Sequence, residues 1–569
     1  MLQKIKTTQM KYLLIITIAL VAFLPACRKQ NAGPVEMYTP GRVFDSLDKN
    51  GTNAQLYLSN IYADMPRGFN RIDNDMLEAA TDDAMPSRDG SNIQIFTRGN
   101  LTITNNPDDS WSQNYASIRK VNILLANIGV VPVPAQVPFW KAEARFLRAL
   151  FYFELLKRYG GVPIIGDSVF NGGDRIAMKR NTFDSCVNYI VSECDNIKGA
   201  VKTEPLAASD WGRVSRGAVL ALRSRVLLYA ASPLYNGGVP SGASPEQQSY
   251  AGYPSFDANR WNKAAIAAND LIALNVYSLE ATFNNAFLNR QNKEVILSYL
   301  RATTTDLETN NGPIGYSLQA AGFGNTSPTQ DLVDAFGMLN GKAITEAGSG
   351  YNPNDPYTGR DPRLANTVLY NNAAWLSRAL QTFEGGLDKP NTNRVQTKTG
   401  YYMRKFLGNF ATSTVYSAQN HNFPLFRIAE TMLNYAEALN EYSGPVVQVY
   451  TTLINIRKRA GIAAGSDSKY GLGATLTKDQ MREVIRNERR VEMAFEEQRY
   501  WDLRRWKIAE TVLNKNLTGM KITKNTNGTF SYQTFAAGQI TFVAPKMYQY
   551  PVPYTEIITN TNLTQNFGW

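Results

Sequence analysis

The chain has 569 residues, enough for a large hydrophobic core, and only 19% of them are charged while 11% are aromatic. Its net charge of +11 is not gathered into basic runs, because arginines alternate with glutamates and apolar residues, and this pattern argues against nucleic-acid binding. The single histidine, His421, excludes most zinc chemistry and the catalytic triads that need an imidazole.

The first 26 residues have the pattern of a secretory signal. Three lysines precede an apolar run over residues 12–23, which is shorter than the roughly 20 residues that span a bilayer. Leu-Pro-Ala then precedes Cys27, as in a bacterial lipobox, so we expect Cys27 to carry the lipid anchor and residues 27–41 to form a tether. An ordinary signal with an incidental cysteine is the alternative. Removal of the three signal lysines lowers the net charge from +11 to +8.

Residues 42–235 have the spacing of long helices. Trp111, Tyr115 and Ile118 lie at i, i+4 and i+7, on one face of a helix. The helix predicted over residues 142–159 is apolar around most of its circumference, so we expect it at the centre of a helical stack. Small and aromatic residues along these helices favour stacked hairpins of the tetratricopeptide type, although no strict 34-residue repeat is visible.

The helix predicted over residues 183–197 contains the two remaining cysteines. Cys186 and Cys194 are separated by about 12 Å of helical rise, whereas a disulfide needs Cα atoms within about 7 Å. We therefore expect two buried, unlinked thiols. Other long helices are predicted over residues 215–232, after Pro424, and over residues 478–499.

The composition changes between residues 236 and 422, where Gly, Asn, Pro and Thr dominate and the predicted helices are short. Irregular segments carried on a rigid scaffold are where binding sites usually lie. The mature chain is therefore predicted to have an N-terminal helical region (42–235), a loop-rich, ligand-facing central region (236–422) and a C-terminal helical region (423–569).

Several sequence motifs, in order along nearly the whole mature chain, resemble those of the SusD/RagB family of outer-membrane lipoproteins. They are Ala142-Glu-Ala-Arg-Phe-Leu-Arg-Ala-Leu-Phe-Tyr-Phe with Tyr159-Gly-Gly-Val-Pro, Gly217-Ala-Val-Leu-Ala-Leu-Arg with Ser232-Pro-Leu-Tyr-Asn, Pro328-Thr-Gln-Asp-Leu-Val-Asp-Ala-Phe, Arg360-Asp-Pro-Arg, Arg427-Ile-Ala-Glu-Thr-Met-Leu-Asn-Tyr-Ala-Glu-Ala, Arg486-Asn-Glu-Arg-Arg-Val-Glu-Met-Ala-Phe-Glu-Glu-Gln-Arg-Tyr-Trp-Asp-Leu-Arg-Arg-Trp and Pro551-Val-Pro-Tyr-Thr-Glu-Ile.

The resemblance implies a mainly α, tetratricopeptide-like scaffold that acts as a lid over a SusC-like TonB-dependent barrel in the outer membrane of a member of the Bacteroidota. Such a protein captures oligosaccharides, or peptides in some relatives, and needs no cofactor. Family members often have acidic residues after the lipidated cysteine, whereas Cys27 is followed by Arg28, Lys29 and Gln30. We still expect the protein to face outside.

Sugar binding needs flat aromatic rings for the C–H faces and polar side chains for the hydroxyls. Irregular segments of the sequence supply both, in places comparable to the ligand-binding loops of glycan-binding relatives, and Trp375 is the foremost candidate. The predicted ligand-binding residues are Arg88, Asn92, Phe96, Asn100, Tyr316, Phe323 and Trp375.

Enzymatic function is not expected. A glycosidase needs two carboxylates about 5 to 10 Å apart across the sugar, whereas side chains adjacent in sequence, such as Asp82-Asp83, Asp108-Asp109 and Glu496-Glu497, point in different directions. The arginine-rich segment 486–505 instead predicts ion pairs that tie stacked helices together. A surface glycoside hydrolase is therefore the least favoured function.

The nature of the ligand is left open by the sequence. A peptide could replace the oligosaccharide on the same scaffold, or the protein could be a structural surface protein without a small ligand. The oxygen-rich segment 352–361 could bind calcium, but its Asn, Asp, Pro and Gly residues are explained more simply by turns, so no metal site is predicted.

Overall fold

The structure is a computed structural model that describes residues 40–171, 173–174, 176–316, 323–392, 394–410 and 416–569. The predicted signal, Cys27 and nearly all of the tether lie outside the described residues. Among the helices in the described part of the chain, none combines the length and apolarity needed to cross a membrane.

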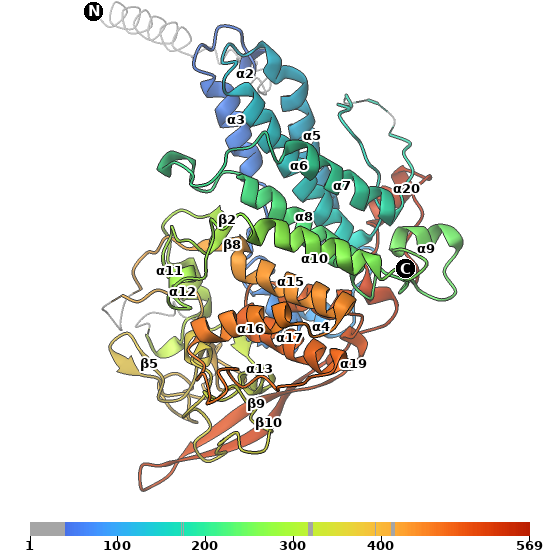
Figure 1. The fold of residues 1–569 in the computed structure, drawn as a ribbon. Helices are drawn as coiled ribbons and strands as arrows, with labels where there is room; N and C mark the ends of the chain where they lie inside the picture. Colours follow the sequence, from blue (N-terminus) through green and yellow to red (C-terminus); the bar gives the residue numbers. More distant parts are fainter. Residues whose placement is uncertain (1–39, 172, 175, 317–322, 393, 411–415) are drawn as a thin grey trace, which may run out of the picture.

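Long helices stack side by side in chain order along the molecule (Figure 1). Each helix up to α15 packs against the next, and α16 and α17 both pack against α15, an arrangement that resembles tetratricopeptide hairpins and confirms the predicted mainly helical fold. Its members are α3 (Thr52–Tyr62), α5 (Trp111–Asn127), α6 (Val137–Tyr159), α7 (Phe183–Ile197), α8 (Arg216–Ala231), α10 (Asn259–Ile272), α15 (Ile428–Ser443), α16 (Val447–Ala460) and α17 (Lys478–Glu492).

Helix α6 is buried along most of its length, as its apolar circumference predicted. It begins five residues before the predicted start, because Pro138 in the first turn fits a helix N-terminus without losing a hydrogen bond. It ends at Gly160, whose φ of 75° and close approach to the Tyr250 carbonyl leave no room for a Cβ atom. Cys186 and Cys194 on α7 are buried and unlinked, as predicted.

The predicted helix over residues 478–499 is wrong, because the chain forms two helices there, α17 and α18 (Gln498–Arg505). Between them Phe495 and Glu497 have left-handed φ values of 61° and 60°. The turn brings the Glu496 carboxylate to Arg427 and directs the Glu497 amide to the buried side chain of Glu78. These tertiary contacts override the local helical propensity.

The described residues contain five two-stranded antiparallel sheets, and three of them join parts of the chain that are far apart in sequence. The central region is bound to the scaffold through β1 (Ala84–Pro86) with β3 (Thr326–Pro328), and through β2 (Val295–Leu300) with β8 (Asn422–Arg427). A long hairpin of β9 (Lys515–Lys524) and β10 (Phe530–Ile540), not anticipated from the sequence, projects from the end of the stack (Figure 1). The remaining pairs are β4 (Val368–Leu369) with β7 (Tyr402–Met403) and β5 (Ala374–Trp375) with β6 (Arg378–Ala379).

Short helices lie in the connections, and several of them interrupt the irregular central region. They are α2 (Pro40–Val43), α4 (Gln94–Thr97), α9 (Pro245–Ala251), α11 (Asn285–Leu288), α12 (Asp306–Asn311), α13 (Gln330–Ala335), α14 (Arg363–Thr367), α19 (Ala509–Leu513) and α20 (Tyr554–Thr559), with 3-10 turns η1 (Leu77–Ala80), η2 (Ile128–Val130), η3 (Ala208–Asp210), η4 (Ile314–Tyr316) and η5 (Lys546–Tyr548).

An ion-pair network in the core confirms the prediction for segment 486–505. The Arg427 side chain is fully buried and contacts three carboxylates, those of Glu294 and Glu492 at 2.8 Å and that of Glu496 at 2.7 Å. Lys405 adds a contact of 2.6 Å to Glu496. Burial alone would raise the pKa of the Glu496 carboxyl, but Arg427 and Lys405 outweigh it and hold that pKa below its usual value.

We expect Arg427→Met to lower the free energy of unfolding by about 3–5 kcal/mol, because it leaves three buried carboxylates without their shared cation. Urea unfolding followed by circular dichroism measures this change. Lys198→Met is the matched control, since Lys198 pairs with Asp195 at an exposed site, and it should shift the free energy by less than about 0.5 kcal/mol. Equal effects of the two substitutions would show that the network does not hold the core.

Candidate ligand-binding site

Three of the predicted ligand-binding aromatics belong to the core, so their expected role as exposed sugar platforms is corrected. The Trp375 side chain is 2% exposed, and its Nε1 donates a hydrogen bond to the Gly408 carbonyl at 3.2 Å. Tyr316 packs against it with ring centroids 4.8 Å apart, and the Tyr316 hydroxyl donates to the Trp375 carbonyl at 2.8 Å.

Phe96 is equally buried, at 2% exposed, between the rings of Tyr500 and Tyr550. Like Trp375 and Tyr316 it leaves no ring face open to a ligand, because its faces are already packed against other aromatic side chains. The three residues therefore contribute to the packing of the core.

The other four predicted residues are at the surface. Asn92, Asn100 and Phe323 are exposed, and Phe323 directly follows the segment 317–322, which lies outside the described residues. None of these three is among the residues that line the hollow beside Arg88. Only Arg88 therefore contributes to the concave site described next.

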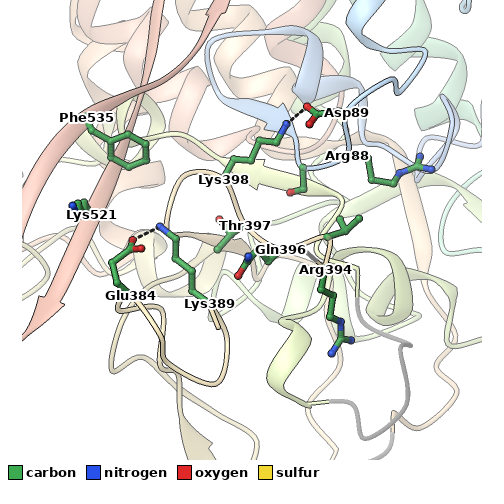
Figure 2. A pocket seen from close by; sticks show the side chains of 12 residues that line it. Arg88, Asp89, Glu384, Lys389, Arg394, Gln396, Thr397, Lys398, Lys521 and Phe535 are labelled. Carbon is green, nitrogen blue, oxygen red and sulfur yellow. Dashed lines mark hydrogen bonds and ion pairs between the residues drawn. The ribbon is translucent and has the colours of Figure 1, made fainter. Parts of the chain in front are cut away.

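A hollow of about 680 Å³ is formed by residues from all three predicted regions of the chain (Figure 2). We call it the basic hollow, because arginine and lysine side chains outnumber carboxylates along its wall. Its lining consists of Ser87, Arg88, Asp89, Glu384, Lys389, Arg394, Val395, Gln396, Thr397, Lys398, Lys521 and Phe535.

The first wall of the basic hollow follows directly from strand β1. The Ser87 amide donates to the Asn325 carbonyl at 2.6 Å and its hydroxyl to the Gly324 carbonyl at 2.5 Å, which extends the β1–β3 pairing by one residue. The next two residues, Arg88 and Asp89, leave the strand and face the hollow.

The second wall is the loop 384–398, and hydrogen bonds fix it to its surroundings. The Glu384 amide donates to the Ile522 carbonyl of β9 at 2.9 Å, and the amide of Lys398 donates to the Ser327 hydroxyl at 3.1 Å. A tight turn at Gly385, with a φ of 81°, returns the chain so that its amide donates to the Lys389 carbonyl at 2.9 Å. The loop is therefore held at both ends.

The third wall comes from the β9–β10 hairpin, which contributes Lys521 and Phe535 (Figure 2). Phe535 is half-buried, and the Lys389 ammonium lies 5.7 Å from its ring centroid. Gln396 and Thr397 add an amide and a hydroxyl group to the lining. The combination of a partly open ring with polar side chains suits a hydroxylated ligand.

Both carboxylates of the basic hollow are paired with lysines. Glu384 contacts Lys389 at 2.7 Å, and Asp89 contacts Lys398. The hydrogen bond and charge of Lys398 lower the pKa of Asp89, while Lys389 lowers the pKa of Glu384 against the effect of burial. Neither carboxyl group holds a proton at neutral pH, so neither is suited to be the general acid of a glycosidase.

Two further hollows are less suited to a sugar. One, of about 650 Å³, is lined by Asn310 and other polar residues, but Arg71 in its wall is bound to the carboxylates of Asp108 and Glu497. The other, of about 610 Å³ beside α5 and α20, is lined largely by apolar side chains. Among the described residues, no group of three or more His, Cys, Asp or Glu side chains is arranged to hold a metal ion.

Of the twelve residues that line the basic hollow, only Arg88 was predicted from the sequence, and those missed include Lys389, Gln396, Lys398, Lys521 and Phe535. A signal for the hairpin existed, because Asn527-Gly528 lies between two runs rich in β-branched and aromatic residues. No local signal connects that hairpin with the loop 384–398, since their contact is tertiary.

Comparison with known proteins agrees with this architecture. A family model described as the SusD family matches residues 287–569, and one described as starch-binding and associating with the outer membrane matches residues 46–228. A SusD-like protein of Formosa agariphila is 25% identical over 469 residues, which cover 80% of this chain and 79% of that protein.

Solved structures show the same fold. A SusD-like protein from Bacteroides fragilis has a TM-score of 0.76 at 24% identity and covers 92% of this chain and 98% of its own. A laminarin-binding SusD-like protein has a TM-score of 0.63 at 21% identity and covers 92% of this chain and all of its own (100%). With the family models matching both the N-terminal and the C-terminal parts, the chain belongs to the SusD/RagB family, whose members associate with the outer membrane.

Proposed function

We propose that the protein is a lipid-anchored surface protein that captures oligosaccharides in the basic hollow without covalent chemistry and delivers them to a SusC-like TonB-dependent barrel. The observation that carries the proposal is the hollow itself, in which Phe535, Gln396 and Thr397 lie together on walls from distant parts of the chain. The description of the matching family as starch-binding and the laminarin-binding neighbour support a carbohydrate as the ligand.

Each part of the lining has a role in this proposal. The C–H face of a sugar ring would pack on Phe535, since aromatic rings stack with the apolar faces of pyranoses. Hydroxyl groups would exchange hydrogen bonds with Gln396, Thr397 and the charged groups at the rim. Because the walls are held by backbone hydrogen bonds, little ordering is needed when a ligand binds.

The proposal also includes the partner barrel and the lipid anchor on Cys27. Docking of the protein as a lid over a barrel would enclose a bound oligosaccharide and exclude water from it, which would strengthen the polar contacts. A lipid on Cys27 would keep the protein at the membrane surface, and the family's association with the outer membrane supports this placement.

We expect Phe535→Ala to weaken oligosaccharide binding about tenfold, because an aromatic contact contributes about 1–1.5 kcal/mol. Isothermal titration of the purified protein with laminarin, starch, uronate and sulfated oligosaccharides measures the effect for each glycan that binds. Phe256→Ala is the matched control, since Phe256 is 65% exposed and lies outside the hollow. Unchanged affinity of the Phe535 variant would show that oligosaccharides bind outside the basic hollow. Binding of peptides alone would show that the ligand is a peptide and not an oligosaccharide.

We expect Cys27→Ser to move the protein from the membrane fraction to the soluble fraction and to abolish its labelling by a radioactive fatty acid. The serine hydroxyl cannot form the thioether that carries the lipid. Cys186→Ser is the control, because the Cys186 thiol is buried in α7. Continued membrane attachment of the Cys27 variant would contradict the anchor.

A further inference from the structure

The ligand class follows from the charge of the basic hollow, on the assumption that the hollow binds a glycan as proposed above. We propose that the protein recognises acidic glycans, in which carboxylate or sulfate groups on the sugar rings pair with the lysine and arginine side chains of the hollow.

The wall of the basic hollow has an excess of positive charge. Five cationic side chains and two carboxylates line the hollow, and the Asp73 carboxylate lies 3.5 Å from Arg88, so cations still outnumber these carboxylates by two. The labelled cations lie on different sides of the hollow, with Lys521 on the hairpin side and Arg88 near the opposite wall (Figure 2). Hydroxyl groups of a neutral sugar do not require such an excess, whereas an anionic ligand relieves the mutual repulsion of these cations.

The second step is the weakness of the ion pairs at the rim. The Asp89 side chain is 87% exposed, so water screens its attraction to Lys398, whose side chain is 29% exposed. Arg88 contacts Asp73 at 3.5 Å, and both side chains are about one-third exposed (30% and 34%). Arg88 also donates a hydrogen bond to the Asp73 carbonyl, so a ligand anion that enters the hollow competes most readily for Lys398.

The third step is the position of Lys521 on β9. Its side chain is exposed, and no carboxylate of the described residues lies within 4.0 Å of its ammonium group. Phe535 on the neighbouring strand β10 lines the same wall. A sugar ring stacked on Phe535 would therefore carry its acidic substituent close to Lys521.

The chemistry of these cations suits two kinds of acidic group. Guanidinium groups such as that of Arg88 form paired hydrogen bonds with planar carboxylates and also with sulfate oxygens. Lysine ammonium groups act as point charges for either anion. Uronates and sulfated sugars present the same anionic oxygens, so the experiment must distinguish them.

The test compares matched acidic and neutral glycans on the full-length protein in detergent. The probes are oligogalacturonate with its carboxyl-reduced form, and dextran sulfate with dextran. We expect at least one acidic member to bind about tenfold more tightly than its neutral counterpart, and roughly 0.5 M salt to reduce the difference. Tighter binding of oligogalacturonate than of its carboxyl-reduced form assigns uronates as the ligand. Tighter binding of dextran sulfate than of dextran assigns sulfated sugars.

The double substitution Lys398→Gln with Lys521→Gln should weaken binding of the acidic glycan about tenfold and weaken binding of its neutral counterpart much less, because only the acidic glycan loses two ionic contacts. Lys263→Gln on α10 is the matched control, because it removes an exposed lysine away from the hollow and should change nothing. Thermal unfolding of each variant establishes that the fold is intact. An unchanged preference in the double variant would overturn the proposal.

The remaining outcomes separate this inference from the proposed function. Equal binding of acidic and neutral glycans, weakened by Phe535→Ala, would overturn the charge preference while glycan capture stands. Binding of poly-L-glutamate as tightly as the acidic glycan would assign the hollow to acidic peptides. If no glycan bound at all, both the proposed function and the inference drawn from it would be wrong.

Discussion

The buried guanidinium of Arg427 is the contact on which the rest of the structure depends. It joins Glu294 at the start of β2, Glu492 at the end of α17 and Glu496 in the turn that follows. An ion pair this deep costs much desolvation free energy, and it is tolerable only because several carboxylates and the Glu492 carbonyl satisfy the same cation. Because the partners come from the central and C-terminal regions, the network determines how those regions are arranged relative to each other, in addition to its contribution to stability.

The turn held by this network also connects the scaffold to the N-terminal loops. Once Glu496 is bound to Arg427 and Lys405, the neighbouring Glu497 is directed toward Arg71, and its amide donates to Glu78 at 2.6 Å. Burial raises the pKa of the Glu78 carboxyl to about 8, so this group is largely protonated at neutral pH and adds no unpaired charge. From η1 the chain continues into β1 and then into the first wall of the basic hollow. A few residues therefore connect the buried ion pairs of Arg427 with the candidate binding surface.

Helices could be predicted from the sequence because their signal is local, whereas the binding residues could not. The apolar circumference of α6 and the i, i+4, i+7 spacing of Trp111, Tyr115 and Ile118 in α5 are visible in a short window of residues. Trp375 is different: flanking Asn and Ala residues suggested an exposed ring, but its burial depends on Tyr316 and Gly408, distant along the chain. The same reason explains the broken helix at Phe495, where a contact with Arg427 outweighs helix propensity. Wherever a position depends on partners far away in sequence, composition and spacing give no indication of it.

The core and the basic hollow differ in how their positive charges are compensated. In the core, Arg427, Arg489 and Arg505 each lie against carboxylates, so the positive charge of these three arginines is compensated by the protein itself. In the basic hollow the cations are more numerous than the carboxylates, although the chain could have placed glutamates there as it does along α17. General basicity of the protein does not explain this, because the net charge of +11 is distributed over 59 basic and 48 acidic residues. A net positive cluster in a concave, rigidly held surface is best accounted for by a counter-charge that arrives with the ligand.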